Sequence, residues 1–266
     1  MYDVAALGEL LIDFTCLTTD ADGYPTMAAH PGGAPANYLA ALTKFGAKTA
    51  MIGKVGNDAF GRLLIKTLKG AGIGTRGMLV SDDVFTTLAF VTLDDSGDRE
   101  FSFARKPGAD TQLRYDEIDL GVIDASKVLH FGTLSMTNEP ARDATYRAVE
   151  YAAGRGKLVS FDPNLRKPLW DDLEEAQRQM LWGLQHADVV KISDEETEFL
   201  FGLAPEAAAK HIIDSFGVRL VYVTCGAEGC YYSTKTASGF VKALSGIAVK
   251  DTTGAGDIFG GSAMYG

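Results

Sequence analysis

The stretch D-T-T-G-A-G-D, Asp251 to Asp257, places two glycines and an aspartate directly before a helix-like run that begins I-F-G-G-S-A-M. A helix N-terminus presents free backbone N–H groups and the positive end of the helix dipole. Glycines at such a turn let an anion approach the backbone closely. We therefore expect Gly254, Ala255 and Gly256 to cradle an anion, with Asp257 beside it. An aspartate that merely caps the helix is the alternative.

The composition is that of an ordinary globular protein with an acidic surface. The 266 residues are 46% hydrophobic and 23% charged, with a formal net charge of −10 and a pI of about 4.9. An acidic protein repels phosphodiester backbones, so we expect no nucleic-acid partner. No apolar run has transmembrane length and the N-terminus lacks a basic region, so we expect a cytoplasmic location and no membrane partner. Three cysteines in no metal or redox spacing are expected to be free thiols.

Short apolar runs alternate with amphipathic segments along most of the chain. Helices are predicted after Asn57 as a cap, between residues 138 and 154, and over 171–186 and 205–216. Alternating strands and helices predict a three-layer α/β/α sandwich around a mostly parallel sheet. The predicted buried strands are residues 4–7, 49–52, 128–131, 158–161, 189–192 and 220–224.

Two segments break this rhythm. Residues 14–31 read as mixed and loop-like, whereas residues 85–105 show two alternating runs around D-D-S-G-D, which predicts a hairpin. Together they could form a small antiparallel sheet outside the main one. It could be an ordinary edge hairpin or a lid over a site at the carboxyl ends of the parallel strands.

Other polar residues also follow predicted strands or open predicted helices. In P-G-G-A-P-A-N, Gly32 and Gly33 allow close approach of a ligand and Asn37 can bind a hydroxyl, although a glycine pair is often only a turn. Asp13 follows the first strand and can accept hydrogen bonds from sugar hydroxyls, unless it is a solvated loop residue.

Two further motifs stand at strand ends. F-D-P-N-L-R holds Asn164 and Arg166, and K-I-S-D-E-E begins at Lys191. Carboxylates in the second motif could hold Mg²⁺ through water. They are also the residues that the first turn of a helix favours for dipole reasons.

Phosphoryl transfer would use these features together. It needs N–H donors for the phosphates, Mg²⁺ and a group that aligns the attacking hydroxyl, a task suited to Asp257. No Walker A motif is present. Gly254, Gly256 and Gly260 approach the Rossmann fingerprint, but their spacing differs by one residue and no βαβ unit follows, which argues against an NAD-dependent enzyme.

These motifs, in this order, resemble those of the ribokinase-like sugar kinases, the PfkB family. P-G-G-A-P-A-N…K-F-G…I-G-K-V-G-N-D resembles one family signature and D-T-T-G-A-G-D-I-F-G-G the other. G-E-L-L-I-D-F, F-A-R-K-P-G-A-D and F-D-P-N-L-R-K-P-L-W look most like fructokinases. The resemblance covers essentially the whole chain, residues 1–266. It implies one kinase domain with a ribokinase-like fold and a β lid over about 14–31 and 85–105.

The resemblance also implies the roles of individual residues. Asp257 would be the base and Gly254, Ala255 and Gly256 the anion hole. Glu196 would serve the metal, with Ser193 in place of the usual asparagine. Family members continue beyond the second signature, so we expect further residues to complete the adenine pocket. The substrate side would comprise Asp13, Gly32, Gly33, Asn37, Arg105 and Arg166, and the nucleotide side Asn164, Lys191, Thr224, Gly226 and Gly229.

The leading hypothesis is an ATP- and Mg²⁺-dependent kinase that converts fructose to fructose 6-phosphate. The alternatives are a ribokinase and a kinase of 2-keto-3-deoxygluconate, in which Arg105 would bind the carboxylate of the substrate. A catalytically impaired sugar-binding protein is an alternative from a different class. Similar kinases can pair through their lids, so we also expect a homodimer, with Arg105 over the sugar when the lid closes.

Overall fold

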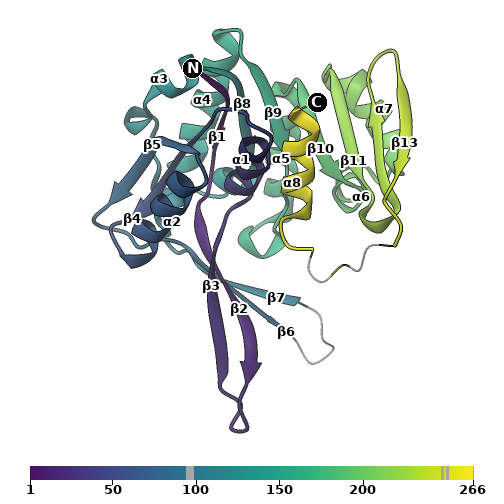
Figure 1. Cartoon of the computed structure of the whole chain (residues 1–266). Coiled ribbons are helices and arrows are strands. Elements are labelled where there is room, and N and C mark those ends of the chain that lie inside the picture. The colour runs from purple at the N-terminus through teal and green to yellow at the C-terminus, as the bar shows by residue number, and fades with distance from the viewer. Residues whose placement is uncertain (94–98, 247–248, 250–251, 266) are drawn as a thin grey trace.

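The computed structural model describes residues 1–93, 99–246, 249 and 252–265. Its centre is a nine-stranded sheet in the order β13-β12-β11-β10-β9-β8-β1-β4-β5 (Figure 1). Neighbours from β11 to β5 pair in parallel, whereas β12 and β13 pair antiparallel at one edge. All six predicted strands are present. The strands are β1 (Tyr2–Leu7), β4 (Thr49–Gly56), β5 (Gly74–Ser81), β8 (Ser126–Gly132), β9 (Leu158–Asp162), β10 (Val189–Ser193), β11 (Leu220–Thr224), β12 (Gly229–Ser233) and β13 (Ser238–Lys242).

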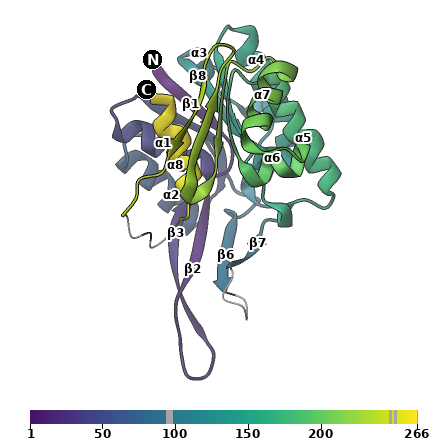
Figure 2. The same ribbon diagram turned by 90° about the vertical axis from the view of Figure 1, so that its right-hand side faces the viewer.

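Helices cover both faces of this sheet, which confirms the three-layer sandwich. One face carries α1 (Ala34–Lys44), α2 (Ala59–Gly70) and α8 (Ala255–Tyr265). Figure 2 shows these three on one side of the sheet and α4 to α7 on the other. The remaining α-helices are α3 (Leu120–Asp124), α4 (Ala141–Gly154), α5 (Leu173–His186), α6 (Asp194–Phe201) and α7 (Pro205–Phe216). Short 3₁₀ helices are η1 (Ala109–Gln112), η2 (Tyr115–Glu117), η3 (Thr133–Met136), η4 (Lys167–Leu169) and η5 (Gly226–Glu228).

The helix predictions hold apart from one cap. Asp58, not Asn57, begins α2, because its carboxylate accepts hydrogen bonds from the N–H groups of Phe60 and Gly61. Asn57 instead donates to Asp82. No helix in the described part of the chain is long and apolar enough to cross a membrane.

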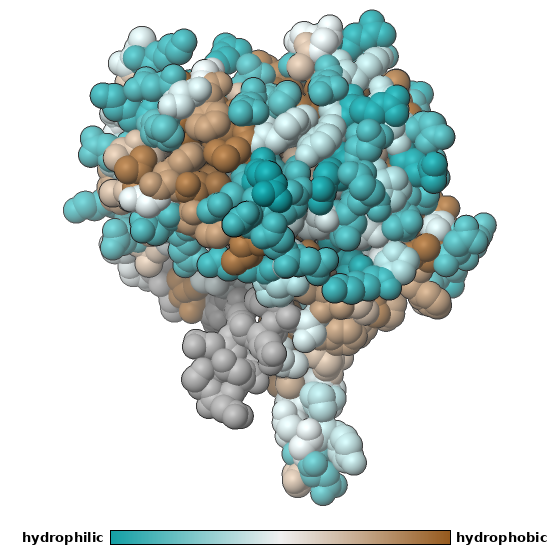
Figure 3. Space-filling view, turned by 180° about the vertical axis from the view of Figure 1, so that it is seen from behind, coloured by the Kyte–Doolittle hydropathy of each residue, from teal (hydrophilic) through white to brown (hydrophobic). Residues whose placement is uncertain are grey.

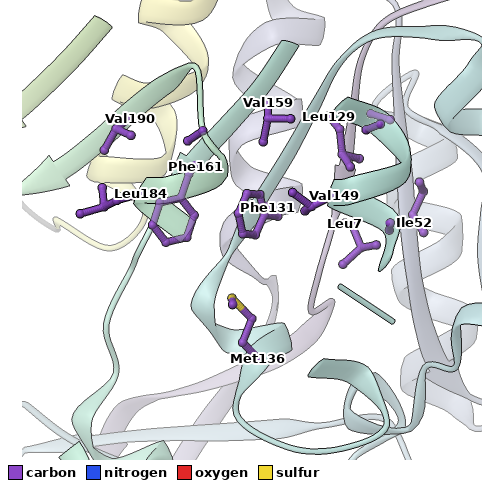
Figure 4. Close-up of a cluster of buried hydrophobic side chains, with 14 of the residues drawn as sticks. Leu7, Ile52, Leu129, Phe131, Met136, Val149, Val159, Phe161, Leu184 and Val190 are labelled. Atoms are coloured by element: carbon purple, nitrogen blue, oxygen red, sulfur yellow. The ribbon is translucent and has the colours of Figure 1, made fainter. Parts of the chain in front are cut away.

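The strand period of two divides the interior into two cores. In β1, Val4 and Ala6 join the core under α1 and α2, while Leu7 joins the core under α4, α5 and α7. The second core is centred on Phe131 and Phe161, whose ring centroids lie 4.7 Å apart (Figure 4). Each fully buried large apolar side chain contributes about 1.5–3 kcal/mol to the stability of the fold.

A second, four-stranded sheet stands below the main body in Figure 1, in the order β3-β2-β6-β7. Its strands are β2 (Leu11–Thr19), β3 (Pro25–Gly32), β6 (Leu88–Leu93) and β7 (Arg99–Ala104). The predicted small sheet therefore exists, but residues 14–31 form strands and not a loop. The sheet is also mixed, because β2 and β6 pair in parallel. The turn predicted at residues 94–98 lies outside the described residues.

The topology fixes where a ligand can enter. The chain moves from β1 outward to β4 and β5, then returns on the other side of β1 with β8. Ligands of open α/β sheets bind at the carboxyl ends of the strands where the order reverses in this way. β2 leaves this end of β1 and places the second sheet beside it.

Candidate active site

A cavity of about 550 Å³ opens at the carboxyl ends of the parallel strands. Most of the predicted site residues line it, although they come from segments far apart in the sequence. They are Asp13, Gly33, Asn37, Asn164, Arg166, Lys191, Glu196, Thr224, Gly226, Gly254, Ala255, Gly256 and Asp257.

The N-terminus of α8 forms one wall of this cavity. Asp257 is buried in the first turn of α8, and its Oδ2 accepts a hydrogen bond of 2.9 Å from Nδ2 of Asn37. Gly254 has φ +73°, a conformation that favours glycine, and a Cβ there would lie 3.1 Å from the Asn37 amide. Among the described residues, the N–H groups of Gly256 and Asp257 have no acceptor. These two N–H groups are therefore available to a ligand, and the anion site expected at this turn stays a prediction. Asp251 lies outside the described residues.

Lys191 lies directly beside this turn. A Cβ on Gly256 would come within 2.8 Å of the Lys191 Nζ atom. Nζ also lies 3.1 Å from Oδ2 of the buried Asp162. Burial opposes the charge on Lys191, but the carboxylates of Asp162 and Glu196 outweigh it and raise the pKa of the ammonium. Lys191 therefore stays protonated where an anion would meet the glycine turn.

Asp162 pairs with Lys191 in a setting that disfavours a carboxylate. Burial raises the pKa of Asp162, the charge of Lys191 offsets part of that shift, and the negative charges of Glu196 and Asp257 add to it. Asp162 also accepts a hydrogen bond from the N–H of Asn164, whose φ of 45° is unusual for a residue other than glycine. This contact fixes the chain where it leaves β9 for the cavity.

Glu196 and Ser193 form the capping box of α6. The Ser193 Oγ accepts the N–H of Glu196 at 3.2 Å, and the Glu196 Oε2 accepts the N–H of Ser193 at 2.8 Å. Oε1 of Glu196 accepts the N–H of Leu165 at 2.7 Å. Each carboxylate oxygen of Glu196 thus accepts one backbone N–H group. The described residues contain no group of three or more His, Cys, Asp or Glu side chains that could hold a metal ion.

The other end of the cavity carries Asp13 and Arg166. Burial raises the pKa of Asp13, and the charge of Arg166 partly offsets this. Gly32 does not line the cavity but packs against Asp13, because a Cβ on Gly32 would overlap the Asp13 carboxylate. Gly33, at φ +114°, lies so close to Glu9 that a Cβ would come within 2.5 Å of its carbonyl oxygen. A carboxylate, a guanidinium and the Asn37 amide suit a ligand rich in hydroxyl groups.

Besides Gly32, two predicted residues, Gly229 and Arg105, do not line the main cavity. Gly229 lines a neighbouring cavity of about 690 Å³ between β11, β12, β13 and α8, which shares Thr224, Gly226, Ala255 and Gly256 with the main one.

Arg105 is buried at the base of the second sheet and does not line the main cavity. Its guanidinium donates to Asp110, to Thr137 Oγ1 at 2.8 Å and to the Leu134 carbonyl at 2.7 Å. Leu134 lines the main cavity, so Arg105 contacts a residue of the cavity wall without lining the cavity itself. Its place over a sugar when the lid closes stays a prediction.

Glu9, a buried charged residue of the cavity wall, was not among the predicted site residues. It follows β1 in G-E-L-L-I-D-F, is 2% exposed, and accepts the N–H of Ala34 at 2.8 Å. The sequence signal for Glu9 was a charged residue between two apolar stretches, where a charge is unusual.

Comparison with known proteins gives a consistent picture. The family described as pfkB family carbohydrate kinase matches residues 1–266. Probable fructokinase-4 of Arabidopsis thaliana is 43% identical over 265 residues, which cover 98% of this chain and 81% of that protein. Fructokinase-2 of Solanum lycopersicum is 42% identical over 268 residues, covering 98% of this chain and 80% of the relative.

Solved structures agree in fold. A Xylella fastidiosa fructokinase with bound ATP has a TM-score of 0.90 and 32% identity, and covers 100% of this chain and 81% of that one. An E. coli protein with the provisional name ribokinase II, in complex with ATP and Mg²⁺, has a TM-score of 0.89 and 30% identity, and covers 100% of this chain and 85% of that one.

Proposed function

The chain belongs to the pfkB family of carbohydrate kinases, and we propose that it transfers the γ-phosphoryl group of ATP to fructose, giving fructose 6-phosphate and ADP. One observation carries this proposal. Asp257, at a glycine turn with free N–H donors, shares one cavity with the hydroxyl-binding side chains of Asp13 and Asn37. Fructokinases among the relatives and the solved structures support fructose as the acceptor.

In this proposal Asp257 is the base. Asn37 occupies Oδ2, which leaves Oδ1 to accept the proton of the sugar hydroxyl. The hydroxyl oxygen forms a bond to the γ-phosphorus while the bond from that phosphorus to the bridging oxygen of ADP breaks, and the proton passes late in this step to Oδ1. In such a loose transition state the position of the carboxylate matters most.

The opposite part of the cavity fits a triphosphate. The turn at Gly254, Ala255 and Gly256 has room only because no side chain fills it, and Lys191 adds a positive charge. Asn164, Thr224, Gly226 and Gly229 would border the nucleotide. Mg²⁺, when bound with ATP, neutralises part of the phosphate charge. Glu196, which lines the cavity, would hold it through water.

The alternatives have less support. A sugar acid such as 2-keto-3-deoxygluconate needs a cation for its carboxylate, and Arg105 is buried and its guanidinium already binds Asp110, Thr137 and Leu134. A binding protein without catalysis has no need of the buried Asp257–Asn37 contact. We also propose a homodimer formed through the second sheet, and a cytoplasmic location stays a prediction.

A turnover panel tests the proposal. Purified protein is assayed with ATP and Mg²⁺ against fructose, ribose and 2-keto-3-deoxygluconate, and the phosphorylated products are identified. We expect the highest kcat/KM for fructose, with the phosphoryl group on the 6-hydroxyl. A preference for either other sugar would contradict the assigned substrate, and ADP release that no sugar stimulates would contradict the kinase assignment.

A further inference from the structure

Helix α1 lacks an N-terminal cap of its own. Its N-cap residue is Gly33, which has no side chain to accept the first N–H groups. A serine or aspartate could not stand there, because φ is +114° and a Cβ would come within 2.5 Å of the Glu9 carbonyl oxygen. The cap is supplied by a different segment: the carboxylate of Glu9 accepts the N–H of Ala34 at 2.8 Å.

This cap stands one helical turn from the reacting groups. Asn37 lies in the first turns of α1, and its backbone N–H donates to the Gly33 carbonyl. Its side chain donates to Asp257 and packs against Gly254. A continuous series of contacts therefore runs from Glu9 through Ala34 and Asn37 to the carboxylate of Asp257.

We propose that Glu9 is a positioning residue for phosphoryl transfer: by capping α1 in place of Gly33, it fixes Asn37 and thereby the orientation of the Asp257 carboxylate. This inference rests on the proposed role of Asp257 as base. The arrangement explains why a charged side chain that is only 2% exposed lies in the cavity wall: Glu9 caps a helix there and does not need to bind a ligand. A carboxylate at the positive end of a helix is also favoured by the helix dipole.

The test compares two substitutions at Glu9 with and without Asn37. Glu9→Ala removes the acceptor, whereas Glu9→Gln keeps an oxygen that can accept the Ala34 N–H. We expect Glu9→Ala to lower kcat by ~10–10²-fold, the scale of a small misplacement of a reacting group, with the KM for ATP unchanged. Glu9→Gln should retain most of the activity.

The double-mutant cycle decides whether Glu9 acts through Asn37. In an Asn37→Ala background, Glu9→Ala should cause little further loss of kcat. An equal loss in both backgrounds, or an unchanged kcat in folded Glu9→Ala, would overturn the inference. Asp172→Ala is the matched control, since Asp172 caps α5 on the other face of the sheet, and its loss should lower stability without changing kcat.

A second variant reaches the same contact from the other side, should Glu9→Ala fold poorly. Ala34→Pro removes the N–H that Glu9 accepts, at the first helical position, where proline is tolerated. It should reproduce the kcat loss of Glu9→Ala, and a full kcat would overturn the inference. The proposed function has a separate outcome. An Asp257→Asn enzyme with full kcat would contradict the role of Asp257 as base. An inactive Asp257→Asn enzyme together with additive effects of the Glu9 and Asn37 substitutions would contradict only the role of Glu9.

Discussion

At the scale of single residues, Gly256 shows how the absence of a side chain makes the site. A Cβ at this position would meet the ammonium of Lys191 and fill the space beside the free N–H groups of the turn. We expect Gly256→Val to raise the KM for ATP by about tenfold, the cost of one charge-assisted hydrogen bond, with a smaller effect on the KM for fructose. Steady-state kinetics with each substrate varied in turn measure this.

The matched control for this substitution is Gly70→Val, where a Cβ would meet no atom within 4 Å. It should leave both KM values unchanged. If Gly256→Val also leaves the KM for ATP unchanged, the turn does not bind the phosphates.

Glu9 makes stability depend on pH. Burial raises its pKa to about 7, against an opposing effect of the Ala34 N–H and smaller effects of Asp110 and Arg105. The folded protein then holds a proton that the unfolded chain releases, so stability falls as pH rises from about 4.5 to about 7 and the penalty is complete above that range. We expect this effect to reach up to about 3 kcal/mol. Urea unfolding of wild type and Glu9→Gln at pH 5 and pH 8 measures it; parallel losses in the two proteins would refute it.

The sequence predicted the convergence at the site better than its supporting contacts. The resemblance to the ribokinase-like kinases assigned Asp13, Asn37 and Asp257 to one site in advance, and the structure places all three around one cavity. The capping contact from Glu9 to Ala34 spans 25 residues and leaves no local pattern. Arg105 binds Leu134 and Thr137, which lie about 30 positions further along the chain. The residues around Arg105 in the sequence therefore did not indicate these contacts.

At the scale of elements, the β2–β3 hairpin shows a related limit. Only the first two residues of β2 are buried, so the strand lacks the alternation of apolar and polar residues from which strands are predicted. Where it meets other elements, Phe14 stacks on Phe90 and packs edge-on against Phe60, which ties the hairpin to β6 and α2. These contacts are long-range, so the sequence alone suggested a loop.

Arg105 connects the second sheet to the main body. It follows β7, and its contacts with Asp110, Thr137 and Leu134 join that strand to η1 and η3. Arg105→Met would leave the buried Asp110 without its cation, so we expect a loss of stability of about 3–5 kcal/mol. The KM for fructose should change little, because Arg105 does not line the cavity.

Thermal or urea unfolding together with fructose kinetics checks this prediction. The double variant Arg105→Met, Asp110→Leu serves as the control and should recover part of the lost stability, since no charge is then left buried. A stable Arg105→Met enzyme with a much higher KM for fructose would instead place Arg105 in the sugar site.

At the scale of the whole molecule, the β2–β3 hairpin extends away from the body (Figure 3). Leu17 and Tyr24 on it are 63% and 71% exposed. A two-stranded ribbon that projects into water is marginally stable unless another surface covers it. We expect a second copy of the chain to cover it, so that the protein sediments as a dimer at micromolar concentration.

The double variant Leu17→Asp, Tyr24→Asp should shift this equilibrium to the monomer. Leu173→Asp changes an exposed leucine on α5, away from the hairpin, and should leave the dimer intact. A wild-type monomer would contradict the proposed assembly.

The central claim is that the carboxylate of Asp257 drives phosphoryl transfer in this cavity. The most direct measurement is kcat for fructose phosphorylation by Asp257→Asn, with fructose binding followed by calorimetry in the same preparation. Asparagine keeps the shape of the side chain but cannot accept the proton. We expect kcat to fall by ~10²–10⁴-fold, the usual loss for a general base, with fructose binding retained. An Asp257→Asn enzyme with a kcat close to that of the wild type would contradict it.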